Sequence, residues 1–123
     1  MTEIKIYLAT PYTGTEVQQI VRFKQACEIC ATLMKKGFRV FSPIAHSHNI
    51  SVYGNMPGGY DFWKEQNSSW LEWADELWVA RMHRWDESKG IKFEIDWAVI
   101  HGLDIKIFTP GKAESMKPYT PVS

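Results

Sequence analysis

The fold of this chain is decided by residues 88–98, which read SKGIKFEIDWA. The apolar segment 76–80 precedes them across a short loop, so the order is strand, loop and helix. A helix that begins near Ser88 leaves its first backbone N–H groups unpaired, with the positive end of the helix dipole behind them. An anion is favoured at such a place. Gly90 lets a ligand approach the backbone closely, and Ser88 suits an N-cap or a hydrogen bond to a phosphate.

Glu94 is the candidate for chemistry on this helix. Its neighbours at helical spacing are Gly90, Ile91, Trp97 and Ala98. The carboxylate therefore lies on a largely apolar face near the anion site, where a nucleophile or a proton carrier would be held with a tuned pKa. A half-exposed glutamate paired with Lys89 or Lys92 explains the same position.

Three motifs occur in order along the chain. They are Tyr-Leu-Ala-Thr-Pro-Tyr at residues 7–12, Phe-Ser-Pro-Ile-x-His-Ser-His at residues 41–48, and Ser-x-Gly-x-x-x-Glu-Ile-x-x-Ala at residues 88–98. Together they resemble the nucleoside 2-deoxyribosyltransferase superfamily, which includes the 2'-deoxynucleoside 5'-phosphate N-hydrolases, and in particular a small bacterial and phage branch of it. The likeness runs from about residue 4 to residue 108.

The resemblance implies roles for individual residues. A tyrosine at the place of Tyr7 hydrogen-bonds the catalytic glutamate, here Glu94, and holds it in position. His46 and Ser47 are implied as polar contacts to a sugar or a phosphate. Thr10 stands where the transferases usually have glycine, which bears on how closely a sugar approaches this loop.

Residues 61–74 are predicted to form a short helix dense in aromatic side chains. One or two of these aromatics would stack against a nucleobase, and the others would be core or interface. The branch that this segment resembles usually carries an aspartate at the place of Asn67, where it serves as acid or base at the leaving nucleobase. An amide can hydrogen-bond a base but cannot deliver a proton at neutral pH. Asp61 or Asp86 would have to take that role.

The composition excludes several classes of partner. The 123 residues make one domain, with 14 Lys and Arg against 14 Asp and Glu, so neither a nucleic acid backbone nor an anionic membrane is an expected partner. No segment approaches the roughly 20 apolar residues of a membrane span. We expect a soluble, cytoplasmic protein that binds a small-molecule nucleoside or nucleotide.

The cysteines and histidines invite a metal or redox interpretation. Cys27 and Cys30 are spaced C-x-x-C, but they lie inside the helical pattern of residues 15–36, which favours core packing. His46 and His48 could ligate a metal, although no regular spacing joins the four histidines of the chain. We expect neither a metal nor another cofactor.

The remaining pattern predicts an α/β fold, a small flavodoxin- or Rossmann-like three-layer sandwich around a four-stranded parallel sheet, or a five-stranded one. Strands are expected at residues 4–9, 38–41, 76–80 and 103–108, and helices at residues 15–36, 61–74 and 88–102. Residues 42–48 read as a loop and residues 49–60 as a flexible lid or specificity loop. The domain spans residues 1–109, and residues 110–123 form a polar tail that is disordered or, as the resemblance implies, reaches into a neighbouring subunit.

The loops after residues 9, 43 and 82 should converge on one crevice. The side chains they bring there are Tyr7, His46, Ser47, Arg84, Asp86, Ser88 and Glu94. The resulting hypothesis is cleavage or transfer at the N-glycosidic bond of a 2'-deoxynucleoside or its 5'-monophosphate, with Glu94 as nucleophile, in a homodimer or higher homo-oligomer. The transferases carry a carboxylate at the place of Ser88 and the monophosphate hydrolases a serine, which favours a 5'-monophosphate and hydrolysis. The alternatives are a module that binds or senses a nucleotide or an ADP-ribose-like ligand, and a purely structural protein whose tryptophans form a partner surface.

Overall fold

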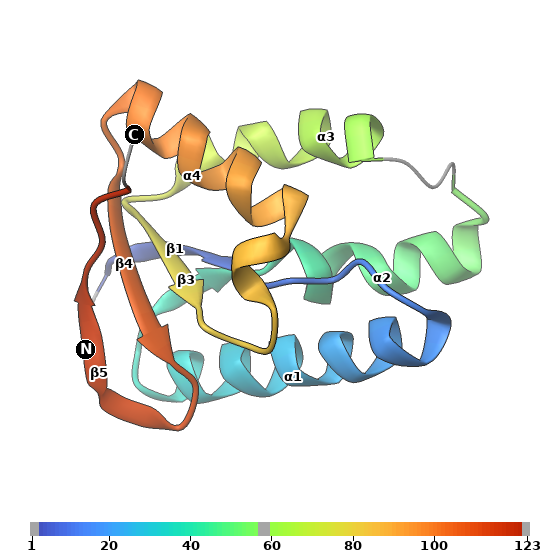
Figure 1. Ribbon diagram of the computed structural model, residues 1–123, viewed down its shortest axis with the longest axis horizontal. Coiled ribbons are helices and arrows are strands. Elements are labelled where there is room, and N and C mark those ends of the chain that lie inside the picture. The colour runs from blue at the N-terminus through green and yellow to red at the C-terminus, as the bar shows by residue number, and fades with distance from the viewer. Residues whose placement is uncertain (1–2, 57–59, 122–123) are drawn as a thin grey trace.

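The computed structural model describes residues 3–56 and 60–121 (Figure 1). Its elements are β1 Lys5–Ala9, α1 Glu16–Lys35, β2 Arg39–Phe41, α2 Pro43–Gly54, α3 Tyr60–Trp73, β3 Glu76–Ala80, the 3-10 helix η1 Trp85–Glu87, α4 Lys89–His101, β4 Asp104–Thr109 and β5 Lys112–Pro118. Each strand and helix that the hydrophobic pattern predicted is present within one or two residues of its expected bounds.

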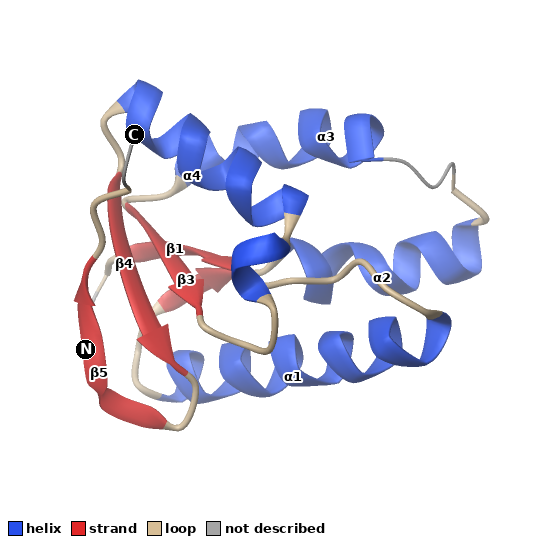
Figure 2. Ribbon diagram, in the orientation of Figure 1, coloured by secondary structure: helices blue, strands red, loops and turns tan. Residues whose placement is uncertain are grey.

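Within the described part of the chain, five strands form one sheet in the order β2-β1-β3-β4-β5, drawn as red arrows in Figure 2. The first four strands of the chain are parallel, and Tyr7 on β1 lies between Phe41 on β2 and Leu77 on β3. Helix α1 covers one face of the sheet, and α3 and α4 cover the other (Figure 1), as right-handed crossovers require. The predicted three-layer α/β sandwich is confirmed.

The central strands β1 and β3 are buried on both faces, and alternate residues enter different cores. Ile6 and Leu8 pack in the core beneath α1, whereas Tyr7 and Ala9 pack in the core beneath α3 and α4. This alternation follows from the two-residue period of a strand. It directs the Tyr7 side chain toward the helix that carries Glu94.

The C-terminal tail differs from the prediction of a disordered segment. Lys112–Pro118 form β5, which pairs antiparallel with β4, so the fifth strand is not parallel to the others. Gly111 has φ +83° and permits the tight reversal between the two strands. An edge strand needs backbone hydrogen bonds on one side only and few buried side chains, so the polar sequence gave no strand signal. Residues 122–123 lie outside the described residues.

Residues 43–48 are helical, not a loop. Ser42 is the N-cap of α2, its Oγ accepts a hydrogen bond from the backbone N–H of Ala45 at 3.1 Å, and Pro43 occupies the first helical turn. The predicted lid at residues 49–60 is therefore wrong for residues 49–54, which belong to α2. Residues 57–59 of that segment lie outside the described residues.

Candidate active site

The centre of the site is a buried pair, Tyr7 on β1 and Glu94 on α4. Helix α4 begins at its N-cap Ser88, whose Oγ accepts a hydrogen bond from the backbone N–H of Ile91 at 3.2 Å. Glu94 lies one further turn along the helix and is 5% exposed, while Tyr7 is 0% exposed. The hydroxyl of Tyr7 donates a hydrogen bond to Oε2 of Glu94. The contact that the resemblance implied is therefore present.

Burial sets the protonation of this pair. Desolvation raises the pKa of Glu94 to about 8, and the hydrogen bond from Tyr7 opposes that rise. Burial, and then the negative charge of Glu94, raise the pKa of Tyr7 well above its usual value, so the phenol remains a donor near neutral pH. Glu94 is buried and Lys92 forms an ion pair with Asp96 at 3.3 Å, so the interpretation of Glu94 as a half-exposed residue paired with Lys92 is wrong.

A chain of aromatic rings leads from this pair toward α2 and α3. The ring centroids of Tyr7 and Phe41 are 5.6 Å apart, and Phe41 stacks on Trp70 at 4.2 Å and an angle of 7°. His46 lies 5.4 Å from Phe41. Of the aromatic side chains considered for base stacking, Trp70 has one face on Phe41 and keeps 37% of its surface exposed.

A cavity of about 380 Å³ lies at the carboxyl ends of β1 and β3, in front of the N-terminus of α4. The three cationic side chains that line it are Arg22, Arg84 and Lys89, and Glu87 is the carboxylate among them. Arg84 binds Glu87 through two nitrogens at 2.7 and 2.8 Å, and its backbone is left-handed with φ 59°. Ser88 also lines the cavity, so two predicted ligand contacts, Ser88 and Arg84, are brought together.

Neither the buried pair of Tyr7 and Glu94 nor the other predicted contacts line this cavity. The Ser47 hydroxyl donates to the carbonyl of Pro43 at 2.6 Å, within the first turns of α2. Asn67 is half-buried on α3, one turn before Leu71, and Asp86 is exposed on η1. Asp61 is paired with Lys64 at 3.5 Å. Gly90 lies in the first turn of α4, where an added Cβ would meet only Ser88 Oγ, at 3.7 Å, so its surroundings leave room for a ligand.

Sequence reasoning missed Arg22 and the pair of Tyr12 and His48. Arg22 comes from α1 and donates through Nη1 to the carbonyl of Thr13 in the loop after β1. Tyr12 OH lies 2.7 Å from Nδ1 of His48. Tyr12 and His48 both stand in the quoted motifs, but their pairing depends on α2, which was not predicted.

The cysteines and histidines form no metal cluster in the described ranges. Across residues 3–56 and 60–121, no group of three or more His, Cys, Asp or Glu side chains is arranged to hold an ion. Cys30 is a free thiol in the core beneath α1, as predicted, and burial raises its pKa to about 11, whereas Cys27 is only partly buried. None of the helices found in these residues is both long and apolar enough to cross a bilayer.

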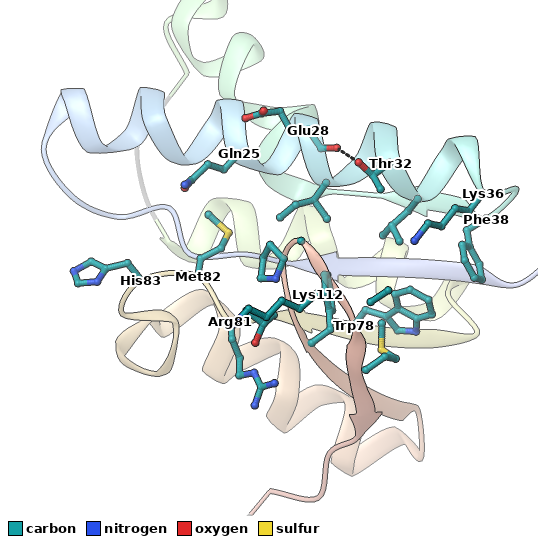
Figure 3. Close-up of a pocket in the computed structure, with 18 residues that line it drawn as sticks. Gln25, Glu28, Thr32, Lys36, Phe38, Trp78, Arg81, Met82, His83 and Lys112 are labelled. Atoms are coloured by element: carbon teal, nitrogen blue, oxygen red, sulfur yellow. Dashed lines mark hydrogen bonds between the residues drawn. The ribbon is translucent and has the colours of Figure 1, made fainter.

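A second cavity, of about 740 Å³, lies on the other face of the sheet (Figure 3). Helix α1 forms one wall with Gln25, Glu28 and Thr32, and the turn between β4 and β5 forms the opposite wall with Lys112. It contains none of the site residues predicted from the sequence. The antiparallel β5 follows β4 without a helical crossover, and on this face β3 and β4 share a buried core with α1.

Comparison with known proteins identifies a family and a related fold. The profile of a family described as a domain of unknown function, DUF1937, matches residues 4–109. Among solved structures, the chain is similar to a 2-deoxyribosyltransferase from the psychrotolerant bacterium Bacillus psychrosaccharolyticus, with 25% identity and a TM-score of 0.55 over 88% of this chain and 74% of that one. None of the curated proteins matches the sequence.

Proposed function

The chain belongs to the DUF1937 family, within the nucleoside 2-deoxyribosyltransferase-like superfamily, and from this premise we propose that it cleaves the N-glycosidic bond of a 2'-deoxynucleoside 5'-monophosphate. Glycosyl chemistry on nucleosides is supported at the level of the superfamily. The observation that carries the proposal is the buried hydrogen bond between Tyr7 and Glu94.

Glu94 acts as the nucleophile in this proposal. Its carboxylate attacks the anomeric carbon, the C–N bond breaks, and the electron pair leaves with the nucleobase. Water then attacks the same carbon, the ester C–O bond breaks and the carboxylate returns. Tyr7 positions Glu94 and favours its ionised form, because a hydrogen bond donated to a carboxylate stabilises the charge.

The cavity beside Ser88 supports a phosphate group on the substrate. The Ser88 oxygen accepts the capping hydrogen bond from Ile91, so its O–H remains able to donate to a ligand. The charged side chains that line it are three cations, Arg22, Arg84 and Lys89, and one carboxylate, Glu87. The N-terminus of α4 adds a positive partial charge. A dianion suits this surface better than a neutral 5'-hydroxyl does. The serine at this place also favours water as the acceptor, because the monophosphate hydrolases that the sequence resembles carry a serine there.

The assay that tests the proposal measures free base by chromatography after incubation with each of the four 2'-deoxynucleoside 5'-monophosphates and with the matching deoxynucleosides. We expect base from at least one monophosphate, and none with Glu94→Gln, which keeps the shape of the side chain. Equal release by the wild type and Glu94→Gln would exclude Glu94 as the nucleophile.

A nucleotide-binding or sensing module is the second candidate, and Asn67 is the observation that favours it. Its amide cannot give a proton to a leaving base. A sensing module would show a nucleotide-induced rise in melting temperature with no base released over long incubation. The base-release assay separates it from the enzyme.

We also propose that the chain forms a homodimer or a larger homo-oligomer. Exposed apolar side chains on α1 and α2 support it, and they are Val17, Ile20, Val21, Met34, Val52 and Tyr53. Helices α1 and α2 pack together, so these side chains belong to adjoining elements. Light scattering should give a mass of at least two chains, and Val17→Asp combined with Val21→Asp should reduce it to one.

A further inference from the structure

A tyrosine and a histidine that the proposed mechanism leaves unused are joined at the same edge of the sheet. The hydroxyl oxygen of Tyr12 lies 2.7 Å from Nδ1 of His48. The imidazole stacks on the ring of Phe23 at a centroid distance of 4.2 Å and an angle of 22°, and Tyr12 meets it edge-on. Tyr12 in the β1–α1 loop and Phe23 on α1 thus contact two sides of the His48 ring, which is carried by α2.

This pair is adjacent to the candidate site. Pro11 and Thr13, which flank Tyr12 in the chain, both line the cavity that contains Ser88. Helix α2, which carries His48, begins two residues after Phe41, the β2 partner of Tyr7 in the sheet. Tyr12 and His48 therefore lie at the carboxyl ends of β1 and β2, the edge at which open α/β sheets bind ligands.

We propose that His48, positioned by Tyr12, protonates the nucleobase as it leaves, in place of the carboxylate that Asn67 does not supply. The inference rests on the proposed N-glycosidic activity. Nε2 of His48 has no hydrogen-bond partner among residues 3–56 and 60–121, so this nitrogen is the one available to a base. His48 is thereby a catalytic residue and Tyr12 a positioning residue.

The protons balance within the pair. In the imidazolium form, Nδ1–H donates to the Tyr12 oxygen and Nε2–H donates to the base. As Glu94 bonds to the anomeric carbon, the C–N bond breaks, its electron pair goes to the base, and the base takes the Nε2 proton. In the second step, water bonds to the anomeric carbon and returns one proton to Nε2, and the ester C–O bond breaks. The products are the free base and the sugar phosphate.

Tyr12 suits both steps because a neutral hydroxyl accepts the Nδ1–H bond whether or not Nε2 is protonated. Burial raises the pKa of Tyr12, which keeps the phenol neutral. The other groups considered for this role are placed differently. Asp61 is paired with Lys64, and Asp86 is exposed on η1.

The test compares two leaving groups, guanine and 7-methylguanine. The base of 7-methyl-2'-deoxyguanosine 5'-monophosphate carries a positive charge and leaves without a proton from the enzyme. His48→Gln should lower kcat on 2'-deoxyguanosine 5'-monophosphate about 100-fold, the usual contribution of a general acid, and should change release of 7-methylguanine by less than about threefold once spontaneous loss is subtracted. His101→Gln, at the exposed end of α4, is the matched control and should change neither rate.

Tyr12→Phe keeps the ring but removes the hydroxyl, and it should show the same substrate dependence with a smaller loss, about tenfold on the natural nucleotide. This variant decides the question if His48→Gln does not fold. A solvent deuterium isotope effect on guanine release should be present in the wild type and absent in His48→Gln. An equal loss on both substrates, or an unchanged isotope effect, overturns the role of His48. Release of no base from any natural monophosphate by the wild type overturns the proposed function instead.

Discussion

Tyr7 donates a hydrogen bond to Oε2 of Glu94 across 87 positions of sequence, and both side chains are buried. The strand alternation that buries Ile6 and Leu8 beneath α1 directs Tyr7 to the opposite face, where α4 presents Glu94. Burying a carboxyl group among apolar side chains costs stability unless the group is neutral or well partnered. A carboxyl group that is buried and hydrogen-bonded in this way, on a helix whose N-cap Ser88 lines a cavity, is typical of functional sites.

Tyr7→Phe should shift the pH dependence of catalysis. The hydrogen bond from Tyr7 lowers the pKa of Glu94, so its loss leaves desolvation unopposed and raises that pKa further above about 8. We expect the pH at half-maximal kcat/KM to increase, and the rate at pH 7 to fall about 10- to 100-fold, as for one lost hydrogen bond to a charged group. The measurement is base release between pH 5 and pH 10. An unchanged midpoint would show that Tyr7 does not act on the ionisation of Glu94.

Glu94→Gln should change how stability depends on pH. In the folded protein the pKa of Glu94 is about 8, against an ordinary value of 4.5, so between these values the folded state binds more protons than the unfolded state. The stability that the neutral carboxyl contributes is full below about pH 4.5 and is lost as the pH rises through 8. Relative to Glu94→Gln, the wild type should therefore lose on the order of a few kcal/mol between pH 4.5 and pH 9. Urea unfolding of both proteins measures this, and parallel pH curves would contradict it.

The helices and strands around the sheet could be predicted because their side chains carry the pattern of burial. Residues 6–9 and 77–80 are continuous apolar runs that are fully buried, and Ser88 and Gly102 mark the ends of α4. The contact between Tyr7 and Glu94 could not be predicted from the burial pattern. No periodicity joins residues so far apart, and only the resemblance to a known superfamily implied it.

The errors have a common physical origin. Helix α2 and strand β5 are peripheral elements that bury few side chains; Pro43 is the buried residue of α2. Their sequences therefore lack the apolar period on which prediction depends, and turn-forming residues dominated the interpretation. The pairing of Tyr12 with His48 was missed for the same reason, because it requires residues 43–54 to be helical.

Gly90→Ala should separate stability from ligand binding. An alanine Cβ at this position would meet only Ser88 Oγ, at 3.7 Å, so the fold has room for it. Alanine is a better helix former than glycine, and we expect the free energy of unfolding to rise by about 0.5–1 kcal/mol. The added methyl group would occupy the space through which a ligand approaches the start of α4, so affinity for the nucleotide should fall. Thermal unfolding and calorimetric titration measure the two effects, and a variant that binds as tightly as the wild type would place the ligand elsewhere.

Ser88→Asp and Ser88→Ala together test whether the cavity receives a phosphate. Aspartate is as good an N-cap as serine, so α4 should keep its stability, whereas alanine should cost about 1 kcal/mol. The aspartate adds a negative charge to the cavity that Arg84 and Lys89 also line, where the proposal places the 5'-phosphate. We expect KM for the deoxynucleoside monophosphate to rise at least about tenfold in Ser88→Asp, since two like charges in contact repel strongly in a partly buried site. KM for the uncharged deoxynucleoside should stay within about twofold of the wild type, because it brings no charge to that place. A parallel rise for both substrates would mean that Ser88 contacts the sugar or the base, and the 5'-monophosphate would no longer be the preferred substrate class.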